Sequence, residues 1–303
     1  MNDRRYLVTV IIPTYGTPAY LKKSIQSVIN QTLKEWELII VDDNDPDSDA
    51  RKKTEELVAY FLETDERIKY IKHPRNMNGA VARNTGFKDA KGIFISLLDS
   101  DDEYMPKRLQ RCYDALISAP DTVAGVYTGC EFRRHGKKYH AEKYVPSGNF
   151  LVDTLACRFM FCTGSNIFVR KSVVEELHGF DPAFLRHQDY EFLVRVFEKY
   201  SLIGLSEVLV IKNNENFNMP NINKLIEIKE QYLVKYSYII DKLPQSDVSY
   251  INSCKCIDLA EGAMANSEFK LVNQYYKEAR KYGPIPLRTW IRRFAYPIYN
   301  LIR

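Results

Sequence analysis

The sequence has no long apolar run. No stretch approaches the ~18 uncharged apolar residues that a membrane-spanning helix requires. The N-terminal apolar segment, residues 7–12, is short and leads into Pro13 without a small-residue cleavage site, which indicates a first strand and not a signal peptide. We therefore expect a cytoplasmic protein that contacts a membrane only peripherally.

Cysteine motifs and glycine-rich motifs are missing as well. The cysteines form no CxxC pair and have no partner histidines at zinc-ligand spacing, and a chain of 303 residues needs no disulfide staples. No GxGxxG opens the first predicted helix and no GxxxxGKS/T occurs, which argues against a dinucleotide-binding Rossmann site and against a P-loop. We expect reduced thiols at all six cysteines: Cys112, Cys130, Cys157, Cys162, Cys254 and Cys256.

The net charge is small and unevenly placed. A formal charge of +4 over 303 residues gives no reason to expect a nucleic-acid partner. Residues 281–303 contain five Lys or Arg and no Asp or Glu, so the rest of the chain sums to −1. Within this tail, residues 287–303 place Trp and Phe on one helical face and Arg on the other, as in a helix that lies in an anionic membrane interface. A helix packed on the protein's own core or on a second subunit is the alternative.

Strand-like and helix-like segments alternate over residues 6–98. This order predicts right-handed βαβ units and an α/β layered sheet. One helix is expected to start at Pro18, and another is expected to cover residues 49–64. The segments that follow, up to Ile211, mix strands and helices, and one helix is expected to start at Pro106. After a polar segment at residues 212–223, interpreted as a linker or loop, the chain is predicted to be wholly helical.

A predicted buried strand, residues 94–98, ends in a cluster of acids. Acids are common at a helix N-terminus, and we expect Asp102 and Glu103 to do no more than begin the next helix. That explanation does not account for Asp99 and Asp101, because carboxylates so close together repel one another. Hard oxygen ligands with few protein contacts suit Mn²⁺ or Mg²⁺ that carries phosphates as further ligands.

Polar residues also follow the first and second predicted strands. In an open α/β sheet, ligands bind beyond the carboxyl ends of the strands. If these strands are parallel, Tyr15, Asp43 and Asp101 lie on one rim. The sequence therefore predicts a site for a metal-bound nucleotide at this rim.

Three segments together resemble the family 2 inverting glycosyltransferases of bacterial polysaccharide or glycolipid synthesis, namely residues 8–45, 76–109 and 179–196. The resemblance implies the GT-A fold, a mixed α/β sheet flanked by helices, with a helical C-terminal extension. The implied glycosyltransferase domain is 1–215, comprising a nucleotide-sugar half at 1–105 and an acceptor half at 106–215. The helical C-terminal region is 216–303, with its basic amphipathic tail.

The resemblance also implies roles for individual residues. Asp43 would hydrogen-bond the base, Asp101 would hold Mn²⁺ or Mg²⁺ directly, and Asp189 would be the general base. Gln188 departs from the family pattern, which commonly has Glu beside the base, and this departure concerns acceptor contacts more than the base itself. The positions that match nucleotide-binding residues are Pro13, Thr14, Tyr15, Asp43, Arg83 and Asp99.

Each of these positions has a structural alternative. Asp43 would cap its own acid-rich loop, Arg83 would form a surface ion pair, and Tyr15 would belong to the core. Asp189 would be the N-cap of the helix that follows it. The loop at residues 162–166 is expected to form a wall of the acceptor site, on its order along the chain alone.

The function that the resemblance implies is inverting transfer of a hexose or N-acetylhexosamine from a nucleoside diphosphate sugar. UDP is the expected carrier, and the expected acceptor is a hydroxyl of a lipid-linked glycan at the inner face of the plasma membrane. A catalytically silent nucleotide-sugar-binding scaffold at the membrane is one alternative. A sugar-phosphate nucleotidylyltransferase is another, but its Gly-rich, Arg-bearing signature after the first strand is absent.

Overall fold

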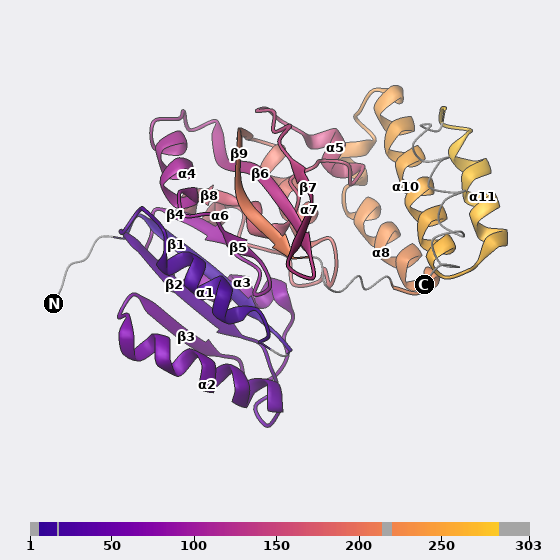
Figure 1. Ribbon diagram of the computed structural model, residues 1–303. Coiled ribbons are helices and arrows are strands. Elements are labelled where there is room, and N and C mark those ends of the chain that lie inside the picture. Colours follow the sequence, from indigo (N-terminus) through magenta and orange to yellow (C-terminus); the bar gives the residue numbers. More distant parts are fainter. Residues whose placement is uncertain (1–5, 17, 214–219, 285–303) are drawn as a thin grey trace. The chain divides into compact units, whose positions relative to one another are not determined.

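The computed structural model describes residues 6–16, 18–213 and 220–284 (Figure 1). Residues 287–303, for which the sequence predicts a basic amphipathic helix, lie outside the described residues. Among the helices that are described, none is both long enough and apolar enough to cross a membrane.

The chain divides into two compact units. Unit 1 comprises Met1–Asn149 and Met160–Glu215, and unit 2 comprises Phe150–Phe159 and Asn216–Arg303. The sequence analysis placed residues 150–159 in the acceptor half, whereas they pack with unit 2. The assignment of a nucleotide-sugar half and an acceptor half stays a prediction.

Unit 1 is built on one mixed sheet. Its strand order is β3-β2-β1-β4-β8-β6-β9-β5, and β7 pairs alongside β6. The strands are β1 (Val8–Thr14), β2 (Trp36–Asp42), β3 (Ile68–Lys72), β4 (Phe94–Leu97), β5 (Glu103–Tyr104), β6 (Val123–Arg134), β7 (Lys137–Glu142), β8 (Phe168–Arg170) and β9 (Ser201–Asn213).

The strand directions bring six carboxyl ends to one edge of this sheet. Strands β1, β2, β3 and β4 are parallel, and β8 runs antiparallel to both β4 and β6. Because β6 therefore runs with β4, and β9 runs parallel to β6, the ends of β1, β2, β3, β4, β6 and β9 share this edge. The predicted mixed α/β sheet is confirmed, and its carboxyl edge is where ligands bind in such folds.

Helices cover both faces of the sheet in unit 1. Apolar residues of α1, α2 and α4 share one core with Val10 and Ile12 of β1. On the other face α3 approaches β1 so closely that a Cβ at Gly86 would lie 2.6 Å from Ile11 Cγ2. The helices of this unit are α1 (Leu21–Ile29), α2 (Asp49–Thr64), α3 (Gly79–Asp89), α4 (Arg108–Ile117), α6 (Lys171–Glu176), α7 (Gln188–Phe197) and the 3₁₀ helix η1 (Gly164–Asn166).

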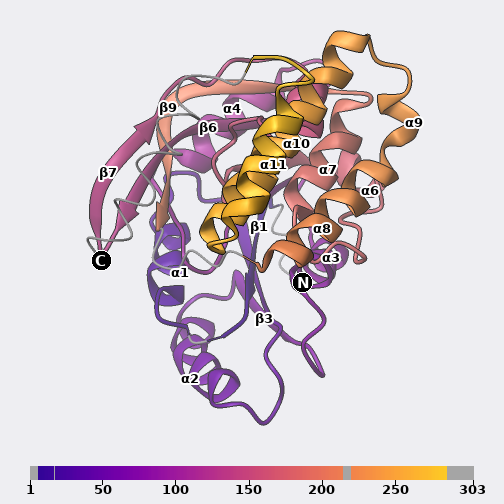
Figure 2. The same cartoon turned by 90° about the vertical axis from the view of Figure 1, so that its right-hand side faces the viewer.

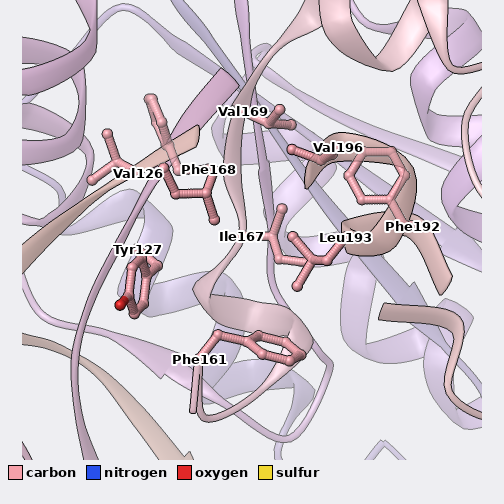
Figure 3. Close-up of a pocket in the computed structure, with 10 residues that line it drawn as sticks. Val126, Tyr127, Phe161, Ile167, Phe168, Val169, Phe192, Leu193 and Val196 are labelled. Carbon is pink, nitrogen blue, oxygen red and sulfur yellow. The ribbon is translucent and has the colours of Figure 1, made fainter. Parts of the chain in front are cut away.

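Helix α7 rests on an apolar core that includes Phe161 and Ile167, which lie before and after η1 in the chain (Figure 3). Phe192 and Leu193 of α7 face Phe161 and Ile167 around a cavity of about 10 Å³. A volume of this size is at the lower limit for one water molecule, and most of the lining side chains are apolar. The position of α7 is therefore set by direct side-chain packing.

The expectation that Asp102 and Glu103 begin a helix is wrong. Glu103 and Tyr104 form β5, which pairs antiparallel with Ile211 and Val210 of β9. The Tyr104 ring is 4% exposed, and its hydroxyl lies 2.8 Å from the Ser96 hydroxyl under the sheet. Burial of this ring turns the chain back to the sheet before α4 can begin.

Two helices start later than the sequence predicts. Helix α1 begins at Leu21 and not at Pro18, and α4 begins at Arg108 and not at Pro106. In both cases the helix starts at or next to its first buried residue, which is Leu21 in α1 and Arg108 in α4. Proline is permitted in the turn that precedes such a start, so its position marks the boundary only to within a few residues.

Unit 2 is wholly helical in its described residues. Its helices are α5 (Leu151–Leu155), α8 (Ile222–Lys235), α9 (Ser237–Ile240), α10 (Gln245–Ala265) and α11 (Phe269–Ala279). The segment that carries α5 is bound to the later helices: Tyr232 Oη donates to Thr154 O at 2.8 Å, and Arg158 Nη2 lies 2.7 Å from Asp258 Oδ1. A core of Ile257, Ala260, Tyr276 and their neighbours joins α10 to α11.

Candidate active site

The residues predicted to form the site lie along the carboxyl edge of the sheet. Pro13 and Thr14 end β1, and Tyr15 follows them with 65% of its surface exposed, which rules out the core alternative for Tyr15. Thr14 is buried, and its carbonyl accepts a hydrogen bond from Asp43 N at 2.9 Å. This hydrogen bond joins the ends of β1 and β2 next to the exposed Tyr15.

Asp43 holds a neighbouring loop and does not cap its own. His73 Nδ1 lies 2.7 Å from Asp43 Oδ1, and Met77 N donates to the same oxygen at 2.8 Å. Asn76 Nδ2 donates to Oδ2 at 3.1 Å, and His73 Nε2 lies 2.9 Å from Thr85 Oγ1 of α3. The sequence analysis did not single out His73 or Asn76. Their contacts hold the Asp43 carboxylate in one orientation between β2, the loop after β3 and α3.

Arg83 links two parts of the site that are far apart in the chain. Its Nη2 donates to Asp99 Oδ1 at 2.8 Å and its Nη1 donates to Gln188 Oε1 at 2.9 Å. The residue is only 8% exposed, so it is not the surface ion pair of the alternative interpretation. Burial opposes its charge, but Asp99 and Asp189 raise the pKa of Arg83 above its ordinary value. A fixed positive charge therefore lies between the end of β4 and the start of α7.

Three acids gather beyond the end of β4. Asp99, Asp101 and Asp102 each offer a carboxylate oxygen, and these oxygens lie within 4.8 Å of one another. Burial favours the neutral form of Asp99, yet Arg83 and Lys212 hold the pKa of Asp99 below its ordinary value. Asp101 is the most exposed member of the cluster. Partial removal of its carboxylate from water and repulsion from Asp99 nevertheless raise the pKa of Asp101, against the attraction of Lys212.

Asp102 is a buried member of this cluster and not a helix start. Its side chain is fully buried, and burial raises the pKa of Asp102 to about 7. Lys212 Nζ lies 3.4 Å from Asp102 Oδ2, and Asn213 N donates to Oδ1 at 3.2 Å. Both partners come from the carboxyl end of β9. The sequence analysis missed Lys212 because it assigned residues 212–223 to a linker, although this lysine directly follows a strand-like apolar run.

The charges of the site fit a divalent cation. Asp99, Asp101, Asp102 and Asp189, opposed by two cations in Arg83 and Lys212, leave a net charge of −2 when all six are ionised. Asp99 and Asp102 each have a cationic partner, whereas Asp101 is exposed at the outer side of the cluster. Mn²⁺ and Mg²⁺ prefer such hard carboxylate oxygens. The donor set therefore fits either ion.

The loop at residues 163–165 lies between the acid cluster and Asp189. Thr163 Oγ1 lies 3.2 Å from Asp99 Oδ2 and 3.1 Å from Asp102 Oδ2. Ser165 Oγ donates to Asp102 Oδ2 at 2.6 Å and accepts from Asp99 N at 2.9 Å. Buried Arg108 supports this loop through the Ser165 carbonyl at 3.2 Å.

Asp189 lies on the other side of this loop. It occupies the first turn of α7, whose N-cap residue is His187, so Asp189 is not the N-cap. Its Oδ1 is buried and has no hydrogen-bond partner among the described residues. Burial raises the pKa of Asp189, opposed by Arg83 and reinforced by Asp99. An unpaired carboxylate with a raised pKa is suited to accept a proton.

Gly164→Ala tests the contact between this loop and Asp189. A Cβ at Gly164 would lie 2.9 Å from Asp189 Oδ1 and would push the carboxylate away. Because a displacement of about 1 Å can cost roughly 10²-fold in rate, we expect a loss of that order in kcat. The melting temperature serves as a control and should change little. Unchanged kcat in a correctly folded variant would show that this contact does not position Asp189.

Comparisons of sequence point to one family. Residues 9–178 match the family model described as Glycosyl transferase family 2. The chain is 32% identical over 235 residues to an uncharacterized glycosyltransferase of Methanocaldococcus jannaschii, covering 76% of this chain and 77% of that relative. It is 29% identical over 151 residues to the putative teichuronic acid biosynthesis glycosyltransferase TuaG of Bacillus subtilis, covering 50% of this chain and 54% of TuaG.

A further relative is named for the reaction that it catalyses. The chain is 39% identical over 110 residues to the UDP-Glc:alpha-D-GlcNAc-diphosphoundecaprenol beta-1,3-glucosyltransferase WfgD of Escherichia coli, covering 36% of this chain and 40% of WfgD. The chain thus spans less than half of that enzyme.

Solved structures share the fold. S. aureus TarS in complex with UDP-GlcNAc has a TM-score of 0.56 at 14% identity, covering 92% of this chain and 93% of that chain. At this identity the likeness concerns the fold alone. It confirms the GT-A fold that the sequence predicts, with its mixed sheet flanked by helices and its helical C-terminal region.

Proposed function

This chain belongs to glycosyl transferase family 2, and from that membership we propose that it transfers a sugar from a UDP-sugar to a hydroxyl of a lipid-linked glycan, with inversion and with a divalent cation. The observation that carries the proposal is the double contact of Arg83, with Asp99 at the acid cluster and with Gln188 beside Asp189. One guanidinium thereby connects an acid cluster suited to a metal with the helix start that carries Asp189, whose buried Oδ1 has no hydrogen-bond partner among the described residues.

The donor would bind along the carboxyl edge of the sheet. We propose that Pro13, Thr14 and Tyr15 pack against the nucleoside and that Asp43 recognises the base. Asp99 would contact the ribose or the water shell of the metal, and Asp101 would hold Mn²⁺ or Mg²⁺. UDP is the preferred nucleotide because TarS structures contain UDP and UDP-GlcNAc and because WfgD is named for UDP-Glc.

The residues of this chain divide the chemistry between them. Asp189 takes the proton of the acceptor hydroxyl as its oxygen attacks the anomeric carbon, and a single in-line displacement inverts that carbon. Arg83 places a positive charge between Asp99 and Asp189 and so reduces the repulsion between these two acids. Lys212 pairs with Asp102 and holds it in its buried position. A cation bound at Asp101 supplies Lewis-acid stabilisation of the departing diphosphate.

The acceptor is proposed from the relatives. TuaG is named for teichuronic acid biosynthesis, the Erwinia amylovora protein AmsB for amylovoran biosynthesis, and WfgD for a diphosphoundecaprenol acceptor. A lipid-linked glycan at the inner face of the plasma membrane is consistent with these names and with the basic sequence of residues 287–303.

A thermal-shift screen tests the donor. Nucleoside diphosphates and their sugars are added with and without Mn²⁺, and a UDP-sugar is expected to raise the melting temperature only with the metal. A shift with another base alone would contradict UDP as the carrier. Donor binding without any release of UDP in the presence of lipid-linked glycans would instead favour the silent scaffold.

The pH dependence of kcat tests Asp189 as the base. A general base must be ionised, so activity is expected to fall as the pH drops through the pKa of Asp189. Because burial raises that pKa, the acid limb should lie above the ordinary carboxyl value of about 3.9. UDP affinity is measured over the same pH range, because a fall in kcat at unchanged UDP affinity cannot result from loss of donor binding. A flat profile down to the ordinary carboxyl pKa would contradict the assignment.

A further inference from the structure

We propose that the hairpin of β6 and β7 is a docking surface that seats the carboxyl edge of the sheet on an anionic lipid bilayer. Residues 131–144, here named the basic hairpin, contain five Lys or Arg against two Glu, a net charge of +3. The inference rests on the proposed function, because a lipid-linked acceptor is what brings the enzyme to a bilayer.

The basic hairpin rises from the edge of the sheet that carries the site. In the parallel pairing of β6 with β9, Phe132 is opposite Lys212 and Arg133 is opposite Asn213. Lys212 and Asn213 are the residues that hold Asp102 in the acid cluster. The base of the hairpin therefore lies directly beside the acid cluster, and Figure 2 shows β7 on the outer side of β6.

The tip of the hairpin is a tight turn. His135 and Gly136 both have positive φ, at 49° and 72°, which is the backbone of a type I′ turn. The first four residues of β7 are exposed, and β7 pairs only with β6 within the described part of the chain. The charged side chains thus project from a short two-stranded ribbon with a defined turn.

Three of the five basic side chains form no ion pair with a carboxylate of the described residues. Glu131 pairs with Arg133 at 2.7 Å and with Lys138 at 2.9 Å. Arg134, Lys137 and Lys143 are exposed and form no ion pair with any described residue. Long exposed cations on a projecting ribbon suit a surface with dispersed negative charge, such as lipid headgroups.

Aromatic side chains accompany these charges. Tyr139 is 58% exposed and Tyr144 is 79% exposed. Tyrosine combines an apolar ring with a polar hydroxyl, which is the combination enriched where proteins meet the headgroup region of a membrane. A soluble polyanion would be matched by charge alone, so the exposed rings favour the bilayer as the partner.

The test compares two triple variants of the full chain. Arg134→Gln, Lys137→Gln and Lys143→Gln together remove the unpaired charges of the basic hairpin. The matched control carries Lys22→Gln, Lys52→Gln and Lys53→Gln, which removes the same charge from exposed positions on α1 and α2. Co-sedimentation measures binding to phosphatidylcholine vesicles with and without phosphatidylglycerol.

We expect the lipid concentration at half-saturation with phosphatidylglycerol to rise about fivefold for each hairpin charge removed, the equivalent of about 1 kcal/mol for each basic residue near an anionic surface. The triple hairpin variant should therefore bind on the order of 100-fold more weakly, and the control should bind like the unmodified chain.

Two results would overturn the proposal. One is a hairpin variant that binds anionic vesicles no more weakly than the control. The other is retained vesicle binding with loss of binding to a soluble anionic polysaccharide, which would assign the surface to a glycan. The UDP-induced thermal shift with Mn²⁺ is measured in parallel: its absence from the unmodified chain contradicts the proposed function, whereas the hairpin variant is expected to keep it.

Discussion

Asp189→Asn is expected to lower kcat by about 10²- to 10⁴-fold, the usual contribution of a general base. The amide keeps the size of the carboxylate on Gly164 but cannot accept the proton of the acceptor hydroxyl. Donor binding should persist, because Tyr15, Asp43 and Asp101, which we propose contact the donor and its metal, lie outside α7. Release of UDP measures turnover, and calorimetry with UDP and Mn²⁺ measures donor affinity.

A second acidic substitution serves as the control. Asp121→Asn changes an exposed carboxylate in the turn before β6 and should leave both quantities unchanged. Turnover of Asp189→Asn at the unmodified rate would remove Asp189 from the mechanism. Loss of UDP affinity together with turnover would instead make Asp189 part of the donor site.

Asp101→Ala is expected to abolish the part of the UDP affinity that depends on Mn²⁺. A divalent cation contributes several kcal/mol to charge stabilisation, so we expect affinity with Mn²⁺ to fall roughly 100-fold or more. Affinity measured with a chelator present should be the same in the variant and the unmodified chain. Isothermal titration with UDP at fixed Mn²⁺ gives both values.

The neighbouring acids sharpen this test. Asp101 is exposed, whereas Asp102 is buried with Lys212, so Asp102→Asn is expected to lower the melting temperature as well as metal affinity. The outcome that contradicts the metal assignment is unchanged Mn²⁺-dependent UDP binding in Asp101→Ala.

The sequence was most informative where burial and periodicity agree. All seven residues of β2 are buried, as a continuous β-branched run predicts for a central parallel strand. Helix α2 covers the predicted residues 49–64, because Ser48 caps it by accepting from Arg51 N. By contrast, β7 was missed, since four of its six residues are exposed and polar and only pairing with β6 makes them a strand.

The residues of the site could be predicted where they belong to local sequence motifs. Tyr15, Asp43 and Asp101 could be placed on one rim from the local sequence, but the partners that hold the acids of the site come from distant segments. Lys212 reaches Asp102 across 110 positions and His73 reaches Asp43 across 30, so no local pattern signals either contact. The misassignment of Asp102 has the same cause: an acid after a strand resembles a helix cap until the strand that buries it is known.

The path of the chain through units 1 and 2 limits how the protein can be recombined. The segment Phe150–Phe159 leaves unit 1, packs with unit 2 and returns just before the loop that contacts Asp99, Asp102 and Asp189. A chimera that exchanges only the region after residue 215 with a relative would separate Thr154 from Tyr232 and Arg158 from Asp258. Replacing unit 2 with that of another glycosyltransferase therefore requires the exchange of two segments. One is the region after residue 215, and the other is Phe150–Phe159, which lies between the two segments of unit 1 in the sequence.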